Sequence, residues 1–283
     1  MALPSYAGPV EIAWYYSYRV ICAAIFIFLI TPILVVIPLS FNAVPFFTFT
    51  PEMLSFDPAG YSLRWYKDFL NNPQWIHSLE NSFIIAIFST LFATVLGTLA
   101  ALGLSRPSTP YKGIIMGILI SPMIVPLIIS ATGMFFFYTS IGLAQTHLGI
   151  ILAHTALGTP FVVITVTATL VGFDQGLIRA AQSLGAKPTV VFFSVMLPLI
   201  LPGVISGGLF AFITSFDEVV VVLFLADFDQ RTIPLQMFSG LREQISPTIL
   251  AVATLLVLIS VALLTTLELL RRRSERLRGM SPQ

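Results

Sequence analysis

Six long apolar stretches constrain this 283-residue chain more than any other feature. A helix needs roughly 20 mostly apolar residues to cross a hydrocarbon core about 30 Å thick. The stretches that meet this length are 20–39, 82–104, 113–138, 148–171, 199–226 and 249–270. The strands of transmembrane barrels are shorter and alternate in hydrophobicity, which these stretches do not. The sequence therefore predicts an all-α integral membrane protein, with six transmembrane helices in a single domain that spans residues 1–283.

The composition supports lipid as part of the solvent. Hydrophobic residues make up 57% of the chain and charged residues only 10%, whereas soluble domains carry about 25% charged residues. The net charge of +1 gives no broad field that would attract nucleic acid. The first apolar stretch is too long for the core of a signal peptide, and no Ala-x-Ala-like cleavage site follows it at the usual distance. We therefore expect it to be retained as the first span.

The lysines and arginines between the stretches predict the orientation, because they gather on the cytoplasmic side of a membrane. One set of segments carries ten of them: Arg19, Arg106, Lys112, Arg179, Lys187, Arg271, Arg272, Arg273, Arg276 and Arg278. The opposite set carries four: Arg64, Lys67, Arg231 and Arg242. This distribution predicts that both termini lie in the cytoplasm, as an even number of spans requires.

No catalytic or metal-binding motif is present in the sequence. The chain has three lysines, and none lies in the Gly-x4-Gly-Lys-Ser/Thr pattern of a phosphate-binding loop. The metal-binding residue types are dispersed along the chain: His77, His147, His154 and the single Cys22. We expect His147 and His154 to be packed or interfacial rather than to relay protons. We therefore expect no catalytic residues, no metal and no cofactor in this chain. The energy for any transport must come from another chain or from an ion gradient.

Several predicted spans contain proline or glycine. The third holds Pro122 and Pro126, the fourth holds Pro160, and the fifth holds Pro202-Gly203. Proline removes a backbone hydrogen bond, which membrane helices tolerate beside a water-filled cavity or a neighbouring helix. These residues indicate helices that surround a path, although proline is also common in membrane helices generally. The run 206–208 (Ser-Gly-Gly) favours close helix packing.

The segment 173–198, between the fourth and fifth spans, has the pattern of a helix-turn-helix. Asp174 can cap a short helix, Gly185 lies where a left-handed turn would end it, and Pro188 suits the first turn of a second helix. An apolar stripe of small and aliphatic residues follows helical spacing: Leu177, Ala180, Ala181 and Leu184. The pattern predicts a compact motif on the cytoplasmic face that another protein's groove can approach closely.

This segment resembles the "EAA" loop of the inner-membrane permease subunits of binding-protein-dependent ABC importers. Ala180, Ala181, Gly185 and Leu197-Pro198 match the motif of that family. Arg179 stands where the family has glutamate, and Val195 stands where it has isoleucine. The arginine puts in doubt any salt bridge expected at that position, but it leaves the helix-turn-helix intact.

The resemblance extends from the first span to the last and is greatest for the spermidine/putrescine branch. The residues that carry it are 40–42 (Ser-Phe-Asn), 81–82 (Asn-Ser), 121–123 (Ser-Pro-Met), 159–161 (Thr-Pro-Phe) and 214–220 (Thr-Ser-Phe-Asp-Glu-Val-Val). It implies a type I ABC importer permease fold in a bacterial inner (plasma) membrane. It also implies a non-catalytic subunit that forms, with a second homologous permease subunit, the path for a small cationic solute such as spermidine or putrescine.

The resemblance also implies partners and a coupling site. The partners are an ABC ATPase dimer that carries ATP and Mg, the second permease subunit, and a periplasmic or extracellular solute-binding protein. The short helix would be seated in a groove of an ATPase subunit. The residues expected at that contact are Arg179, Ala180, Ala181, Leu184, Gly185 and Pro198.

Two acids near the end of the fifth span are candidates for the translocation path. Asp217 and Glu218 precede a wholly apolar run, and carboxylates at membrane depth are costly unless they face a cavity or a partner. Phe136 and Tyr138 can offer cation–π surfaces to a cationic solute. The alternative is that the two acids cap a broken fifth helix or bind loops of the sister permease.

Other functions stay open at this level. The solute of an ABC permease can instead be another small polar compound, such as an amino-acid derivative, an opine, an aminophosphonate or iron. A stand-alone secondary transporter needs coupling-ion residues inside the bundle and often an inverted repeat, and the sequence shows no convincing repeat. A membrane enzyme is disfavoured because the side chains of an active site are missing.

Overall fold

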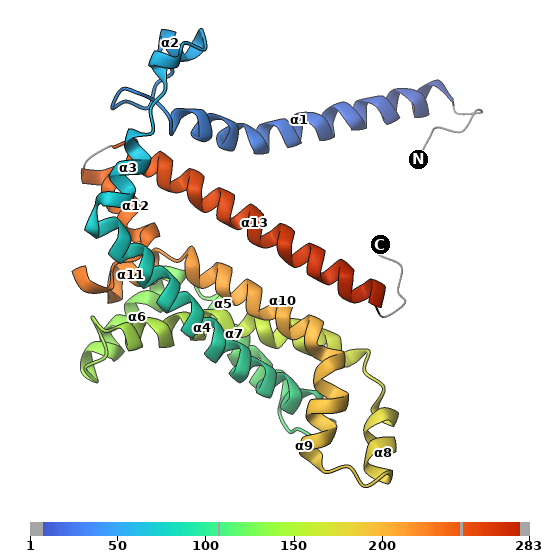
Figure 1. The fold of residues 1–283 in the computed structure, drawn as a ribbon. Helices are drawn as coiled ribbons and strands as arrows, with labels where there is room; N and C mark the ends of the chain where they lie inside the picture. The colour runs from blue at the N-terminus through green and yellow to red at the C-terminus, as the bar shows by residue number, and fades with distance from the viewer. Residues whose placement is uncertain (1–7, 107, 244–245, 278–283) are drawn as a thin grey trace. The chain divides into compact units, whose positions relative to one another are not determined.

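The computed structural model describes residues 8–106, 108–243 and 246–277, which are mostly helical (Figure 1). Within them it shows no strand, only an isolated antiparallel bridge between Asn42 and Tyr61. The elements in chain order are α1 (Pro9–Leu39), α2 (Pro51–Leu54), η1 (Pro58–Gly60), α3 (Arg64–Asn71), α4 (Pro73–Ser105), α5 (Lys112–Ile124), α6 (Leu127–Ser140), α7 (His147–Val171), α8 (Gln175–Ser183), α9 (Pro188–Val191), the π-helical turn η2 (Phe192–Met196), α10 (Leu197–Phe216), α11 (Val220–Leu225), η3 (Phe228–Gln230), α12 (Ile233–Glu243) and α13 (Thr248–Leu277). The predicted all-α class is confirmed.

The chain divides into two compact units, Met1–Asn72 with Gly240–Gln283 and Pro73–Ser239. In the first unit α13 packs against α1 and α3. The short helix α3 buries Trp65 and Phe69, four residues apart on one face. Its Asp68 accepts a 2.6 Å hydrogen bond from the hydroxyl of Thr248. This bond ties α3 to the start of α13.

Helix α1 exposes apolar side chains around its whole circumference. None of the residues in its most apolar window is buried, although the mean hydropathy of that window is 3.1. Glu11 stabilises the start of the helix by accepting a hydrogen bond from the Gly8 N–H group. A helix that is apolar all round must be covered by lipid or by another chain.

The core of the second unit is formed by α4, α7 and α10, which lie side by side (Figure 1). Small residues allow these helices to approach closely. A Cβ atom on Gly207 would lie 2.7 Å from the Cα atom of Val162, and one on Gly158 would lie 2.9 Å from the Cβ atom of Ala211. The close packing predicted for residues 206–208 is present at Gly207 and Gly208, which are both buried.

We expect Gly207→Ala to destabilise this packing. The added methyl group meets the backbone of α7, which cannot move aside as a flexible side chain can. Overpacking of this kind costs about 1–3 kcal/mol, so the midpoint of thermal unfolding in detergent falls by several degrees. Gly133→Ala is the matched control, because a Cβ atom there meets nothing within 4 Å. Equal midpoints for the two variants would contradict the packing argument.

The helices agree only partly with the predicted spans. Four helical segments are long and apolar enough to cross a membrane: α1, α4, α7 and Pro188–Phe216. The pair α5–α6 makes a fifth only if the bent pair is one span, and α13 contributes the shorter apolar segment Thr248–Ala262. The count of six spans therefore stays a prediction. Of the ten cations on the predicted cytoplasmic side, Arg278 lies outside the described residues.

The predicted third span, 113–138, is a bent pair of helices in the structure. Helices α5 and α6 meet at an angle of 102°. Val125 takes an extended conformation, with ψ 133°, because the ring of the following Pro126 disfavours helical geometry in the preceding residue. Pro122 lies inside α5 without breaking it. The proline at position 126 therefore redirects the chain, and the one at position 122 does not.

The predicted fifth span, 199–226, is a broken helix in the structure, as the alternative interpretation of its two acids expected. Helix α10 ends at Phe216, and α11 begins at Val220. The backbone N–H group of Asp217 still donates to the carbonyl of Ile213, and the helical pattern stops there. The carboxylate of Glu218 then supports the start of α11. The two adjacent acids thus mark the interruption.

Candidate functional site

The predicted helix-turn-helix of residues 173–198 is present in the structure. The carboxylate of Asp174 accepts a 2.7 Å hydrogen bond from the Gly176 N–H group and so caps α8. Gly185 follows α8 in the left-handed region at φ +81°, where glycine has no steric penalty. Pro188 occupies the first turn of α9. Asp174 thus fixes the start of α8, and Gly185 and Pro188 fix the turn between α8 and α9.

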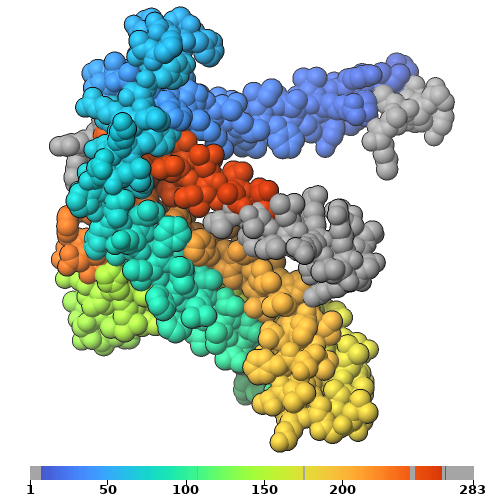
Figure 2. Space-filling view, in the orientation of Figure 1, coloured from blue at the N-terminus to red at the C-terminus, as the bar shows by residue number. Residues whose placement is uncertain are grey.

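Helix α8 presents most of its surface to the outside. It packs against α9 and the π-helical turn, and this part of the second unit projects beyond the end of α4 (Figure 2). Leu184 is 89% exposed and Leu177 is 43% exposed. Ala180 is exposed between them, and Ala181 is half-buried. An exposed apolar stripe next to small residues is the surface that a partner's groove would cover.

The other residues predicted at this contact lie around the same motif. Arg179 and Gly185 are exposed. Pro198 lies in the first turn of α10, directly after the π-helical turn, in which the Leu197 N–H group donates to the carbonyl of Phe192. Proline has no N–H group to donate to the preceding turn, and its ring crowds the backbone of that turn. Both effects favour the wider π-helical turn at residues 192–196. The π-helical turn therefore joins α9 to α10 without an interruption.

The structure places the two candidate acids in different surroundings. Glu218 is buried, and its Oε1 atom accepts a 2.8 Å hydrogen bond from the Val221 N–H group. Its carboxylate thereby supplies the acceptor that the first turn of α11 lacks. Asp217 lies at the end of α10 with its side chain exposed. Asp217 is thus accessible, whereas Glu218 is buried and makes a hydrogen bond that supports α11.

The two candidate aromatic residues do not share one surface. Tyr138 is buried in a cluster with Val221, Val222 and Leu225. Phe136 is 68% exposed on the same helix, α6. The cluster packs α6 against α11, so it sets the position of the segment that follows the two acids. Of the two, Phe136 is the one whose ring is accessible.

A polar network that the site prediction did not include lies at the end of α4 that holds Asn81. The Nδ2 group of Asn81 donates to the carbonyls of Asp229 (2.8 Å) and Arg231 (3.1 Å), and its Oδ1 atom lies 2.9 Å from His147 Nε2. The adjacent Ser82 hydroxyl accepts a 2.8 Å hydrogen bond from the Ile233 N–H group. The sequence signal was the pair Asn81-Ser82 itself, which belongs to the resemblance. Its bonds hold the segment 229–233 on α4 and α7.

We expect Asn81→Ala to loosen this segment. The change leaves the Arg231 carbonyl and the His147 ring without this partner, while the Asp229 carbonyl keeps His77 Nε2 at 2.9 Å. Each lost bond costs about 1–3 kcal/mol. Hydrogen–deuterium exchange of residues 226–233 should therefore become roughly tenfold faster or more, since 1.4 kcal/mol is a factor of ten. Glu80→Ala is the control, because that neighbouring side chain is exposed. Unchanged exchange in Asn81→Ala would show that the network does not hold the segment.

The remaining buried histidine has a packing role. His154 is 1% exposed between helices, and its Nδ1 atom lies 2.8 Å from the hydroxyl of Ser215 on α10. His154 therefore joins α7 to α10 by this bond. Across the part of the chain that the structure describes, no three His, Cys, Asp or Glu side chains gather closely enough to hold a metal ion.

The described helices form an all-α membrane fold with an exposed helix-turn-helix between α7 and α10. Residues 93–276 match the family model described as "Binding-protein-dependent transport system inner membrane component". This match covers more than half of the chain, which therefore belongs to that family of ABC importer permeases.

Curated relatives agree with the family. The chain is 30% identical over 250 residues to the spermidine/putrescine transport system permease protein PotC of Haemophilus influenzae, covering 88% of this chain and 94% of that one. It is 31% identical over 242 residues to the putrescine transport system permease protein PotI of Escherichia coli K12, covering 82% of each.

Solved structures share the fold. A bacterial ABC transporter involved in the import of the acidic polysaccharide alginate superposes with a TM-score of 0.73 at 14% sequence identity, covering 94% of this chain and 99% of that one. The same kind of transporter, in complex with an alginate pentasaccharide-bound periplasmic protein, gives a TM-score of 0.62 at 16% identity and covers 95% and 97%. At these identities the likeness supports the fold and not the solute.

Proposed function

We propose that this chain is the transmembrane subunit of an ATP-driven importer of polyamines such as spermidine or putrescine. The observation that carries the solute class is the identity of 30% and 31%, over most of the chain, to permeases named for these two compounds. The subunit forms the path together with a second homologous permease. A periplasmic or extracellular binding protein delivers the solute to the outer side.

Helix α8 is the proposed contact with the ATPase. Its exposed stripe, Leu177, Ala180 and Leu184, would be buried in a groove of that partner. A movement of α8 would pass through α9 and the π-helical turn into α10, which packs against α4 and α7. ATP and Mg bind to the partner ATPase, whose closure would shift the permease between inward and outward access. Both termini of the permease lie on the cytoplasmic side with α8.

Asp217 and Glu218 are the proposed residues of this chain that attract the cationic solute. Asp217 is exposed where α10 ends, and Phe136 of α6 offers an accessible ring that can bind an ammonium group. Glu218 contributes negative charge from a buried position that its bond to Val221 stabilises. Tyr138 does not contact the solute in this proposal. It packs against Val221, Val222 and Leu225 and so positions α11.

Uptake of labelled spermidine and putrescine tests the solute class. Cells from which the gene for this chain has been deleted should lose most of their energy-dependent uptake and regain it with the wild-type gene. An excess of unlabelled polyamine should suppress uptake, whereas amino acids, opines, aminophosphonates and ferric iron should not. The proposed solute would be wrong if the deletion left polyamine uptake unaffected and the wild-type gene restored uptake of one of those other solutes.

A further inference from the structure

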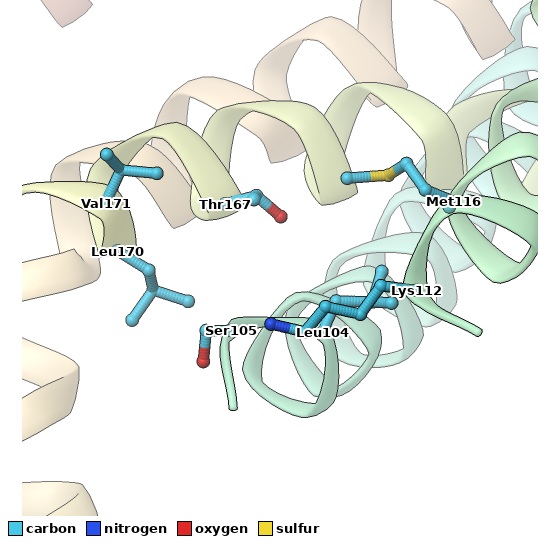
Figure 3. A pocket seen from close by; sticks show the side chains of 8 residues that line it. Leu104, Ser105, Lys112, Met116, Thr167, Leu170 and Val171 are labelled. Atoms are coloured by element: carbon cyan, nitrogen blue, oxygen red, sulfur yellow. The ribbon is translucent and has the colours of Figure 1, made fainter. Parts of the chain in front are cut away.

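A cavity of about 380 Å³ lies in the second unit, away from the residues proposed for coupling and translocation (Figure 3). The end of α4, the start of α5 and the end of α7 line it and leave it open on one side. Its walls are formed by Leu104, Ser105, Lys112, Gly113, Met116, Thr167, Leu170 and Val171. Four of these residues are apolar and bulky, two carry hydroxyl groups, one is a cation and none is an acid.

Lys112 gives the cavity a positive charge. Its side chain is half-buried, and Figure 3 shows its ammonium nitrogen directed toward Ser105. Helix α5 begins at this residue, and the side chain of Tyr111 does not cap it. The first N–H groups of a helix have no partner within the helix, and they carry a partial positive charge. The wall that contains Lys112 and Gly113 therefore attracts an anion.

Thr167 supplies an unsatisfied donor on the opposite wall. Its hydroxyl is buried and has no hydrogen-bond partner, and it points into the space between α7 and the other two helices (Figure 3). A buried polar group without a partner is costly, so an acceptor that enters the cavity gains this bond. The hydroxyl of Ser105 donates its proton to the carbonyl of Leu102, and its oxygen can still accept a hydrogen bond.

We propose that this cavity binds the phosphate headgroup of an anionic phospholipid. Lys112 and the first turn of α5 hold the phosphate, and the Thr167 hydroxyl donates to one of its oxygens. The apolar side chains Leu104, Met116 and Leu170 accept the glycerol and the upper part of an acyl chain. A polyamine does not fit, because its ammonium groups meet Lys112 and no carboxylate.

Lipid is favoured over a soluble anion by the place of the cavity. Ser105, Lys112 and Val171 all lie at ends of apolar helices, on the side where the positive residues predict the cytoplasm. The cytoplasmic leaflet carries anionic lipids, and basic pockets between helices on that side bind their headgroups. Mostly apolar walls suit a molecule that is part hydrocarbon, whereas a free phosphate would gain nothing from them.

Native mass spectrometry of the full-length purified chain tests the site. The protein is titrated with phosphatidylglycerol and, separately, with phosphatidylcholine of the same acyl chains. We expect tighter binding of phosphatidylglycerol, and Lys112→Gln should weaken it about fivefold, since one cation near an anionic surface contributes about a factor of five. Thr167→Val keeps the shape of the side chain and should also weaken binding. Arg106→Gln removes an exposed cation of the same connecting segment that does not line the cavity, so it should change nothing.

Two results would overturn the assignment. Equal retention of phosphatidylglycerol by Lys112→Gln and Arg106→Gln would show that the cavity does not hold the headgroup. Millimolar inorganic phosphate could also displace the bound phosphatidylglycerol from the wild-type protein. If phosphate binding were weakened by Lys112→Gln in the same way, the cavity would be a site for a soluble anion. Neither result bears on the proposed polyamine uptake, because binding is measured without transport.

Discussion

Replacing Ala180 with glutamate should abolish most solute uptake while leaving the permease folded. Ala180 is exposed on α8 between Leu177 and Leu184, so the new side chain meets solvent in the isolated chain. In the complex the same carboxylate would be buried in the groove of the ATPase without a partner. Burying an unsatisfied polar group costs about 1–3 kcal/mol and a charged one more. The affinity for the ATPase should therefore fall roughly 5- to 150-fold.

The measurement pairs uptake with recovery of the ATPase on the purified permease. Gln182→Glu is the matched control, because it adds the same charge to the same helix about 160° away from Ala180 by helical geometry. It should retain most uptake, and both variants should elute as the wild-type protein does in size-exclusion chromatography. Normal uptake by Ala180→Glu would show that the apolar stripe of α8 is not the contact surface.

The double variant Asp217→Asn, Glu218→Gln should lower polyamine uptake about tenfold or more without preventing assembly. Hydrogen bonds to charged groups contribute about 1.5–3 kcal/mol, which corresponds to roughly 10- to 150-fold. Glutamine keeps a side-chain oxygen that can accept the bond from the Val221 N–H group, so α11 should still form. Initial uptake rates over a range of spermidine concentrations show whether the loss lies in apparent affinity or in turnover.

Two further variants separate attraction of the solute from folding. Asp229→Asn removes an exposed acid that bonds to Asn81 and His77 through its backbone carbonyl, so it should leave uptake near the wild-type rate. Glu218→Ala removes the acceptor for α11 and should lower the thermal midpoint as well as uptake. Wild-type uptake by the double variant, with ATPase activity intact, would remove the two acids from the path.

Local features of the fold were predicted well where a short stretch of sequence determines them. The lengths of the hydrophobic stretches predicted the long helices, because few structures other than a helix can hydrogen-bond all backbone N–H and C=O groups within lipid. Asp174, Gly185 and Pro188 predicted the ends of α8 and α9, because caps and positive φ angles depend on single residues. The sequence therefore located the proposed coupling motif to within a few residues.

Features that depend on tertiary contacts could not be read in the same way. The sequence offered Pro122 and Pro126 as equal candidates for a break, and only the structure shows that the chain turns at Pro126. Asp217 and Glu218 are adjacent acids, yet one is exposed and the other is buried against the start of α11. The network around Asn81 joins residues 148 and 150 positions apart. No local pattern carries that information.

We propose that this permease receives its energy at α8 from a separate ATPase. A photo-crosslinking amino acid placed at Leu184, which is 89% exposed, tests it in native membranes. Mass spectrometry after irradiation and affinity purification should identify an ABC ATPase subunit joined at this position, and a second permease chain should co-purify. The same amino acid at Phe136, also exposed but far along the chain on α6, should not capture the ATPase. If no ATPase is recovered with the permease or joined at Leu184, the account is contradicted.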